Sequence, residues 1–84
     1  YSLTVEQYDA MLQDQDGVCA NCGEAETHRS RTGEVSRLAV DHDHLTGAVR
    51  ALLCHGCNTG IGSFRDDPER LRAAAAYIER HRAR

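Results

Sequence analysis

The sequence predicts a small α+β domain that is held together by a bound metal ion. The chain has 84 residues, 40% of them apolar, with no Trp and a single Phe. A hydrophobic core of that size barely offsets the entropy of ordering the chain, so a staple is expected. Cysteines occur in two Cys-x-x-Cys pairs, and helical periodicity at both ends flanks two short apolar runs. We expect residues 1–84 to form one domain.

The cysteine spacing favours a structural zinc site. The two pairs are separated by residues 23–53, a spacing typical of four-thiolate zinc sites. Glycines beside the pairs allow each one to bend into a knuckle. Disulfides are the alternative: bridging within a pair would be strained, but cross-pairing remains open. The predicted ligands of one Zn²⁺ are Cys19, Cys22, Cys54 and Cys57.

Reduced zinc thiolates favour an intracellular location. No stretch of the sequence approaches the length of a membrane span, and no secretory leader is recognisable, so no membrane partner is expected. The chain begins at Tyr1 rather than Met, which allows for trimming of the natural start.

The first half of the chain predicts one helix, a polar loop and a strand. Thr4 and Gln7 match a capping box, and apolar residues at helical spacing extend the helix over about residues 5–15. Residues 24–37 are polar and predict an exposed loop. Residues 38–40 form a short apolar run suited to a buried strand, which we expect to return over residues 48–53 as a hairpin.

The last part of the chain predicts two further helices. Residues 58–64 fit a short helix weakened by two glycines. Asp67 and Pro68 then form a helix start, with Asp67 as the cap. Ile61 and Phe64 are expected to pack on the hairpin, and the apolar face of the last helix is expected to comprise Leu71, Ala74, Ala75 and Ile78.

The charge pattern neither excludes nor advertises nucleic-acid binding. The net charge is −3, but all ten basic residues are Arg, whose planar guanidinium suits phosphate. A solvated surface is the plain alternative for any single arginine. Carboxylates at Asp41 and Asp43 would reverse the local field if they faced a bound cation. Arg50 and Arg65 are the main candidate DNA contacts, with the arginines of the last helix, Arg70 to Arg84, as further ones.

The run Asp41-His42-Asp43-His44 carries the chemistry. Phosphodiester hydrolysis needs a base for water and a hard cation for the developing charge. Histidine, with an ordinary pKa of about 6.5, is a competent base, and carboxylate and amide oxygens suit magnesium. Asn58 directly follows the last cysteine, so closing the zinc site would bring it toward this run. Ordinary loop residues and a second zinc site are the alternatives.

The position of this run poses a geometric problem. Neighbouring side chains on a regular strand point to opposite faces, so Asp41 and His42 could not serve one site there. If the strand frays at Asp41, the backbone can turn both side chains inward.

The chain resembles the recombination endonuclease VII family, a branch of the His-Me finger (ββα-metal) nucleases related to the HNH enzymes. Three segments carry the resemblance: residues 17–23 (GVCANCG), 38–47 (LAVDHDHLTG) and 49–62 (VRALLCHGCNTGIG). The similarity spans about residues 4–80. It implies a zinc-pinned ββα-metal core flanked by an N-terminal and a C-terminal helix.

The resemblance also implies roles for single residues. Asp41 and Asn58 would bind one catalytic Mg²⁺ or Mn²⁺, His42 would be the general base, and His44 would contact the scissile phosphate. Cleavage would leave a 5′-phosphate and a 3′-hydroxyl. The family's namesake has an acidic residue one helical turn after the Asn, where this chain has Ile61.

A small phage or prophage endonuclease that nicks or cuts DNA is therefore the leading hypothesis. The chain stops at Arg84, without the helical dimerisation region of the namesake, so a dedicated junction resolvase is not expected. A homodimer is allowed but not required. The alternatives are a non-catalytic zinc-ribbon module that binds nucleic acid or protein, and a purely structural zinc domain of a larger protein.

Overall fold

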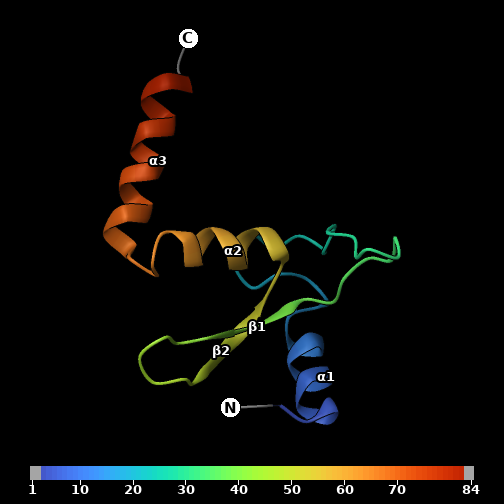
Figure 1. The fold of residues 1–84 in the computed structure, drawn as a ribbon. Helices are drawn as coiled ribbons and strands as arrows, with labels where there is room; N and C mark the ends of the chain where they lie inside the picture. Colours follow the sequence, from blue (N-terminus) through green and yellow to red (C-terminus); the bar gives the residue numbers. More distant parts are fainter. Residues whose placement is uncertain (1–2, 83–84) are drawn as a thin grey trace.

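A computed structural model describes residues 3–82 of the chain. The elements follow in the order α1 (Val5–Asp14), β1 (Ala39–His42), β2 (Val49–Leu53), α2 (His55–Ser63) and α3 (Pro68–Arg82). Figure 1 shows the hairpin of β1 and β2 in the middle, with α2 crossing on one side and α1 at the far end. The predicted small α+β class is confirmed. Of the arginines expected on the last helix, Arg84 lies outside the described residues.

Helix α1 begins and ends as its sequence predicts. The Thr4 hydroxyl accepts a hydrogen bond from the Gln7 N–H at 3.0 Å, and the Gln7 side chain accepts from the Thr4 N–H at 2.9 Å. This reciprocal capping box satisfies two N–H groups that the first helical turn leaves without partners. Tyr8 anchors the helix to the hairpin, because its hydroxyl donates to the Leu38 carbonyl at 2.6 Å.

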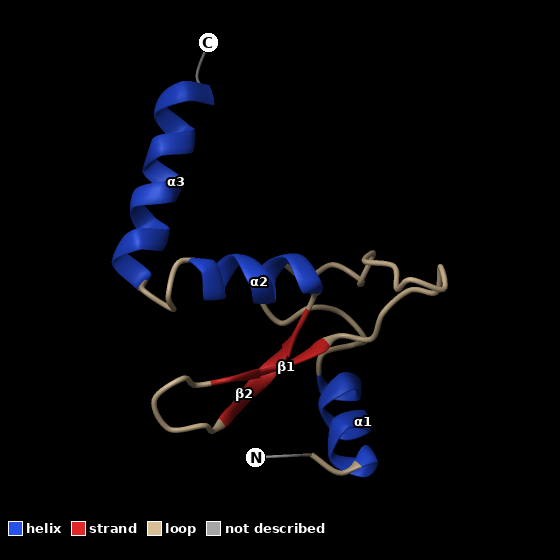
Figure 2. Cartoon of the chain, viewed as in Figure 1, coloured by secondary structure: helices blue, strands red, loops and turns tan. Residues whose placement is uncertain are grey.

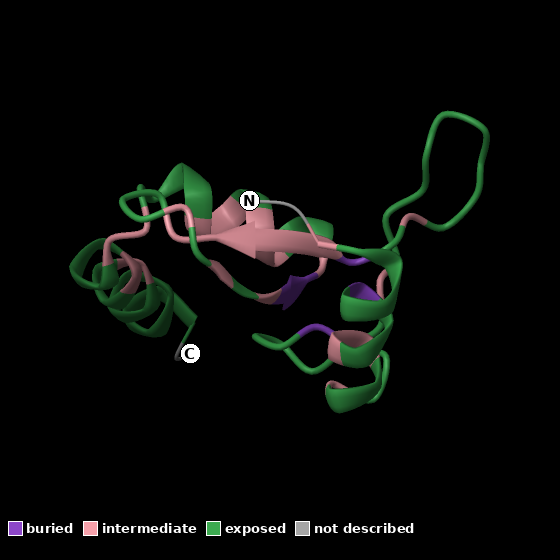
Figure 3. Ribbon diagram, turned by 90° about the horizontal axis from the view of Figure 1, so that it is seen from below, coloured by how far each residue is buried: buried purple, intermediate pink, exposed green. Residues whose placement is uncertain are grey.

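The hydrophobic core is small and includes a cysteine. The buried residues among those described are Tyr8, Cys19, Leu38, Leu52 and Leu53. Ile61 of α2 packs against this cluster, as expected from the sequence. Figure 3 shows how few segments are buried compared with those that are exposed. A core of this size agrees with the expectation that a metal ion supplies part of the stability.

The hairpin is paired through Asp41 and carries a register shift directly after it. Strand β1 continues to His42, two residues beyond the predicted run, so the condition that it frays at Asp41 is not met. The register shifts between Asp41, which pairs with Ala51, and His42, which pairs with Val49. Arg50 is therefore an extra residue on β2, as in a β-bulge. Such a bulge bends the strand that carries the extra residue, here β2, and increases the local twist of the hairpin.

Helix α2 begins earlier than the sequence suggested. We expected a short helix over residues 58–64, but α2 spans His55–Ser63 with Cys54 as its N-cap. The Cys54 sulfur accepts a hydrogen bond from the Cys57 N–H at 3.4 Å, as an N-capping oxygen would. The second cysteine knuckle is thus also the first turn of α2. Asn58 lies in that turn, and its N–H donates to the Cys54 carbonyl at 2.9 Å.

Helix α3 begins as predicted but projects away from the rest of the fold (Figure 2). Asp67 precedes it, and the Asp67 carboxylate accepts from the Glu69 N–H at 3.0 Å. None of its described residues is buried, and Ile78 on the predicted apolar face is 51% exposed. Phe64, expected to pack on the hairpin, is 38% exposed. Within residues 3–82, no helix combines the length and apolarity needed to cross a bilayer.

Candidate metal and nuclease site

The four cysteines meet at one point of the fold. Their sulfur atoms lie within 4.8 Å of one another, a spacing that a single tetrahedral zinc ion can bridge. Cys19 is buried, Cys54 and Cys57 are half-buried, and Cys22 is exposed. No described cysteine pair is joined as a disulfide, since all four are free thiols. The predicted ligand set Cys19, Cys22, Cys54 and Cys57 therefore has the donors and the geometry for one structural zinc.

Hydrogen bonds from N–H groups of Asn21 stabilise negative charge on two of the cysteine sulfur atoms. The Cys19 sulfur accepts from the Asn21 N–H at 3.3 Å, and the Cys57 sulfur accepts from the Asn21 side-chain amide at 3.3 Å. Burial works to raise the pKa of Cys19, but backbone N–H groups lower it to about 6. At Cys57 the Asn21 amide acts to lower the pKa, yet burial and neighbouring thiols raise it to about 12. A cation at the centre of the four sulfur atoms would favour the thiolate form of both cysteines.

A second polar site lies beside the zinc cluster. A cavity of about 240 Å³ is lined by Asp41 and His42 from β1, His44 from the connection after it, Asn58 from α2, and Val40. The structure thus brings together all four side chains that sequence analysis singled out for chemistry. The hairpin supplies three of them, and the first turn of α2, fixed by Cys54 and Cys57, supplies the fourth.

The donor set of this cavity suits a hard divalent cation. Asp41 offers carboxylate oxygens and Asn58 an amide oxygen, the ligand types that Mg²⁺ and Mn²⁺ accept. Both Asp41 oxygens already accept hydrogen bonds from Arg50, at 2.6 and 3.0 Å. An ionised carboxylate has about four acceptor positions, so a cation would share the Asp41 oxygens with the Arg50 guanidinium.

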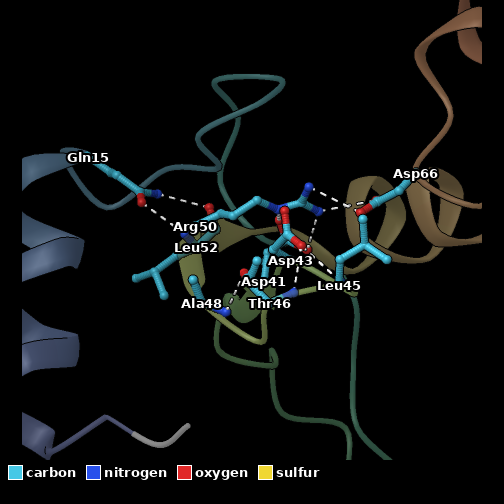
Figure 4. A network of polar contacts seen from close by, with 9 residues as sticks. All are labelled: Gln15, Asp41, Asp43, Leu45, Thr46, Ala48, Arg50, Leu52 and Asp66. Atoms are coloured by element: carbon cyan, nitrogen blue, oxygen red, sulfur yellow. Dashed lines mark hydrogen bonds and ion pairs between the residues drawn. The ribbon is translucent and has the colours of Figure 1, made fainter.

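Arg50 lies between two carboxylates, as Figure 4 shows. Its Nε and Nη2 contact Asp41, and its Nη1 and Nη2 contact Asp66 at 3.1 Å each. Hydrogen bonds from the guanidinium to Asp41, and then to Asp66, raise the pKa of Arg50 above its ordinary value. Arg65, the other predicted DNA contact, is exposed beyond the end of α2. Sequence analysis missed Asp66, since its partner lies far away in the sequence.

Asp43 builds the turn instead of facing the cavity. Its Oδ1 accepts from the N–H groups of Leu45 and Thr46 at 2.8 and 3.0 Å (Figure 4). These two hydrogen bonds lower the pKa of the Asp43 carboxyl, and the bond from the Thr46 N–H has the larger effect. The Thr46 hydroxyl in turn accepts from the Ala48 N–H at 3.2 Å. The connection that carries His44 is therefore held by its own side chains.

Glu26 connects the polar loop to α2, a contact that the sequence did not signal. One oxygen of its carboxylate accepts from the His55 N–H at 2.8 Å, and the other accepts from the Thr27 and His28 N–H groups at 3.1 Å. Although burial opposes the shift, the bonds from His28 and His55 lower the pKa of Glu26. The His28 and His55 rings stack with centroids 3.8 Å apart. Apart from an isolated bridge between Arg29 and Val35, residues 24–37 are the exposed loop that we expected.

Comparison with known families identifies the family to which this chain is related. The family model for recombination endonuclease VII matches residues 1–80. The chain belongs to the recombination endonuclease VII family. This confirms the resemblance carried by the cysteine knuckles and the Asp-His run.

Two curated phage proteins are similar to this member of the endonuclease VII family. The Gene 59 protein of Mycobacterium phage D29 is 43% identical over 81 residues, which cover 95% of this chain and 46% of that protein. The Gene 59 protein of Mycobacterium phage L5 is 39% identical over 79 residues, 93% of this chain and 44% of that protein. The chain thus spans less than half the length of these relatives. No solved structure matched it.

Proposed function

We propose that this chain is a divalent-metal-dependent DNA endonuclease domain with a ββα-metal core. The observation that carries the proposal is the shared cavity of Asp41, His42, His44 and Asn58. Membership of the endonuclease VII family supports phosphodiester hydrolysis. A purely structural zinc domain, in contrast, would not need a base and two hard oxygen donors in one pocket.

Each residue has a defined task in this proposal. Asp41 and Asn58 would hold one Mg²⁺ or Mn²⁺, which would supply positive charge to stabilise the charge that develops in phosphodiester hydrolysis. His42 accepts a proton from the attacking water, and His44 contacts the scissile phosphate. Attack in line on phosphorus leaves a 5′-phosphate and a 3′-hydroxyl. Cys19, Cys22, Cys54 and Cys57 bind zinc and fix α2, and so Asn58, against the hairpin.

DNA contacts outside the cavity are proposed at Arg50 and Arg65. Arg65 is exposed, and Arg50 is 37% exposed and contacts Asp41, which lines the cavity. Such contacts to phosphate are independent of sequence and weaken as salt rises. We propose that the substrate is DNA, that the protein acts inside a phage-infected or prophage-bearing cell, and that one copy of the domain suffices for a nick.

The test is cleavage of supercoiled plasmid by the zinc-loaded protein. We expect cutting with Mg²⁺ or Mn²⁺ and none when both are omitted, a condition that leaves zinc in place where excess EDTA would not. His42→Ala should abolish cutting while zinc content and circular dichroism stay unchanged. His81→Ala, on α3 beside Tyr77, is the matched control and should cut like the parent. If His42→Ala cuts as fast as the parent, the role assigned to His42 is wrong. If the parent itself does not cut, the non-catalytic zinc module becomes the better account.

A further inference from the structure

Asp66 is a carboxylate that the endonuclease mechanism does not use, although it reaches the same guanidinium as Asp41. It lies between α2 and α3, where its N–H donates to the Ile61 carbonyl at 3.1 Å. Its backbone adopts the left-handed region, with φ 58°, which Asp tolerates better than most residues. This ending of α2 turns the Asp66 side chain back toward the hairpin, and Figure 4 shows it facing Arg50 from the side opposite Asp41.

Asp41, Arg50 and Asp66 form one ion-pair network, in which two carboxylates contact a single guanidinium. Both carboxylates are more buried than the guanidinium: the side chains of Asp41 and Asp66 are 12% and 18% exposed, against 37% for Arg50. Arg50 engages each carboxylate through two nitrogens. The group as a whole carries a net charge of minus one. Without Asp66 it would be neutral, with the charge of Arg50 directed at Asp41 alone.

We propose that Asp66 is a positioning residue that holds Arg50, so that Asp41 keeps enough negative charge to bind the divalent cation. The inference rests on the proposed function, because it takes Asp41 to be a metal ligand. A guanidinium balanced by a second carboxylate orients Asp41 through hydrogen bonds, as outer partners of metal ligands do. An unbalanced guanidinium beside Asp41 repels a divalent ion and competes with it for the same oxygens.

A purely structural role for Asp66 makes a different prediction. In that case the ion pair with Arg50 only fastens the α2–α3 connection to β2, and its loss would lower thermal stability without a specific effect on cation binding. The two roles separate when Arg50 is removed as well. If Arg50 competes with the cation for Asp41, removing Arg50 restores the cation affinity that is lost with Asp66. If Asp66 has only a structural role, removing Arg50 does not change the cation affinity.

The experiment is a Mn²⁺ titration of the zinc-loaded protein without DNA, followed by the electron paramagnetic resonance signal of free Mn²⁺. We expect Asp66→Asn to weaken Mn²⁺ binding about tenfold, in the range seen when outer partners of metal ligands are lost. Asp66→Glu should retain most of the affinity, and the double variant Arg50→Gln with Asp66→Asn should regain most of it. Zinc content and thermal midpoint are measured on every variant.

Asp67→Asn is the matched control. It removes the same charge one residue away, from a carboxylate that caps α3 and contacts Arg70, and Asn keeps the capping function. Equal weakening by Asp67→Asn would overturn the inference, because a general charge effect would then explain it. Parent-like binding by Asp66→Asn, or a double variant as weak as Asp66→Asn alone, would also overturn it while leaving the endonuclease proposal intact. A parent that binds no Mn²⁺ would overturn both.

Discussion

The side-chain amide of Gln15 is hydrogen-bonded to both backbone groups of Leu52. Its Oε1 accepts from the Leu52 N–H at 3.0 Å, and its Nε2 donates to the Leu52 carbonyl at 2.9 Å (Figure 4). The same Nε2 donates to the Val18 carbonyl at 2.8 Å. Gln15 thus covers the outer edge of β2 in place of a third strand, and it connects the end of α1, the first cysteine knuckle and the hairpin.

Gln15→Ala should therefore destabilise the fold more than an average surface change. The substitution removes the side-chain partners of the Leu52 N–H and the Val18 carbonyl, which should cost about 1–3 kcal/mol. The Leu52 carbonyl keeps its bond from the Ala20 N–H at 3.0 Å. Gln13→Ala is the control, because Gln13 lies exposed on the same helix. Urea denaturation of the zinc-loaded proteins measures the difference. Equal midpoints for the two variants would show that water replaces the Gln15 amide at no cost.

Loss of a cysteine should unfold the domain. Cys54 is predicted to bind zinc and also caps α2, so Cys54→Ser should abolish stoichiometric zinc binding and remove the helical circular dichroism signal, since binding energy at a structural zinc is folding energy. Ala20→Ser, an exposed change within the first knuckle, should leave both unchanged. A Cys54→Ser protein that melts cooperatively at the parent temperature would argue against a structural zinc.

The turn built by Asp43 should matter for rate rather than for metal binding. Asp43→Ala removes the acceptor for the Leu45 and Thr46 N–H groups, so His44 loses its fixed position. We expect slower plasmid cutting, by up to about 100-fold if His44 moves by about 1 Å. Asp43→Asn keeps an acceptor oxygen and should cut nearly like the parent. Mn²⁺ affinity should be the same in both variants, and a loss in either would mean that Asp43 is itself a ligand.

Stability should depend on pH through Glu26. The pKa of this carboxyl is lowered in the folded state, so its contribution is present above the unfolded glutamate pKa of about 4.3 and is lost as pH falls through the lower folded value. Glu26→Gln should therefore be less stable than the parent at neutral pH, with the difference shrinking in acid. Comparing the two proteins at each pH removes the acid loss of zinc that they share. A constant difference across pH would exclude the carboxylate charge as the cause.

The sequence predicted those parts of the fold that depend on local signals. The capping box at Thr4 and Gln7, the start of the last helix at Asp67 and the exposed loop over residues 24–37 were all predicted, because each is specified by neighbouring residues. The start of α2 was not, because its N-cap is Cys54 and cysteine is not among the residues that usually cap a helix.

The sequence predicted which residues line the candidate site but not the contacts that hold them in place. Asp41, His42, His44 and Asn58 were identified from residue type and order, and they line one cavity. The register shift opposite Arg50 and the contact between Arg50 and Asp66 depend on three-dimensional pairing between distant segments, which no local pattern signals. The exposed face of α3 likewise could not be predicted, since periodicity shows that a helix has an apolar face but not what lies against it.

Crystals of the zinc-loaded protein grown with Mn²⁺ would test the central claim most directly. Anomalous diffraction should show zinc among the four cysteine sulfurs and manganese within about 2.2 Å of side-chain oxygens of Asp41 and Asn58, a distance appropriate for oxygen ligands of such an ion. Manganese absent from that cavity, with Asp41 still hydrogen-bonded to Arg50, would contradict the account.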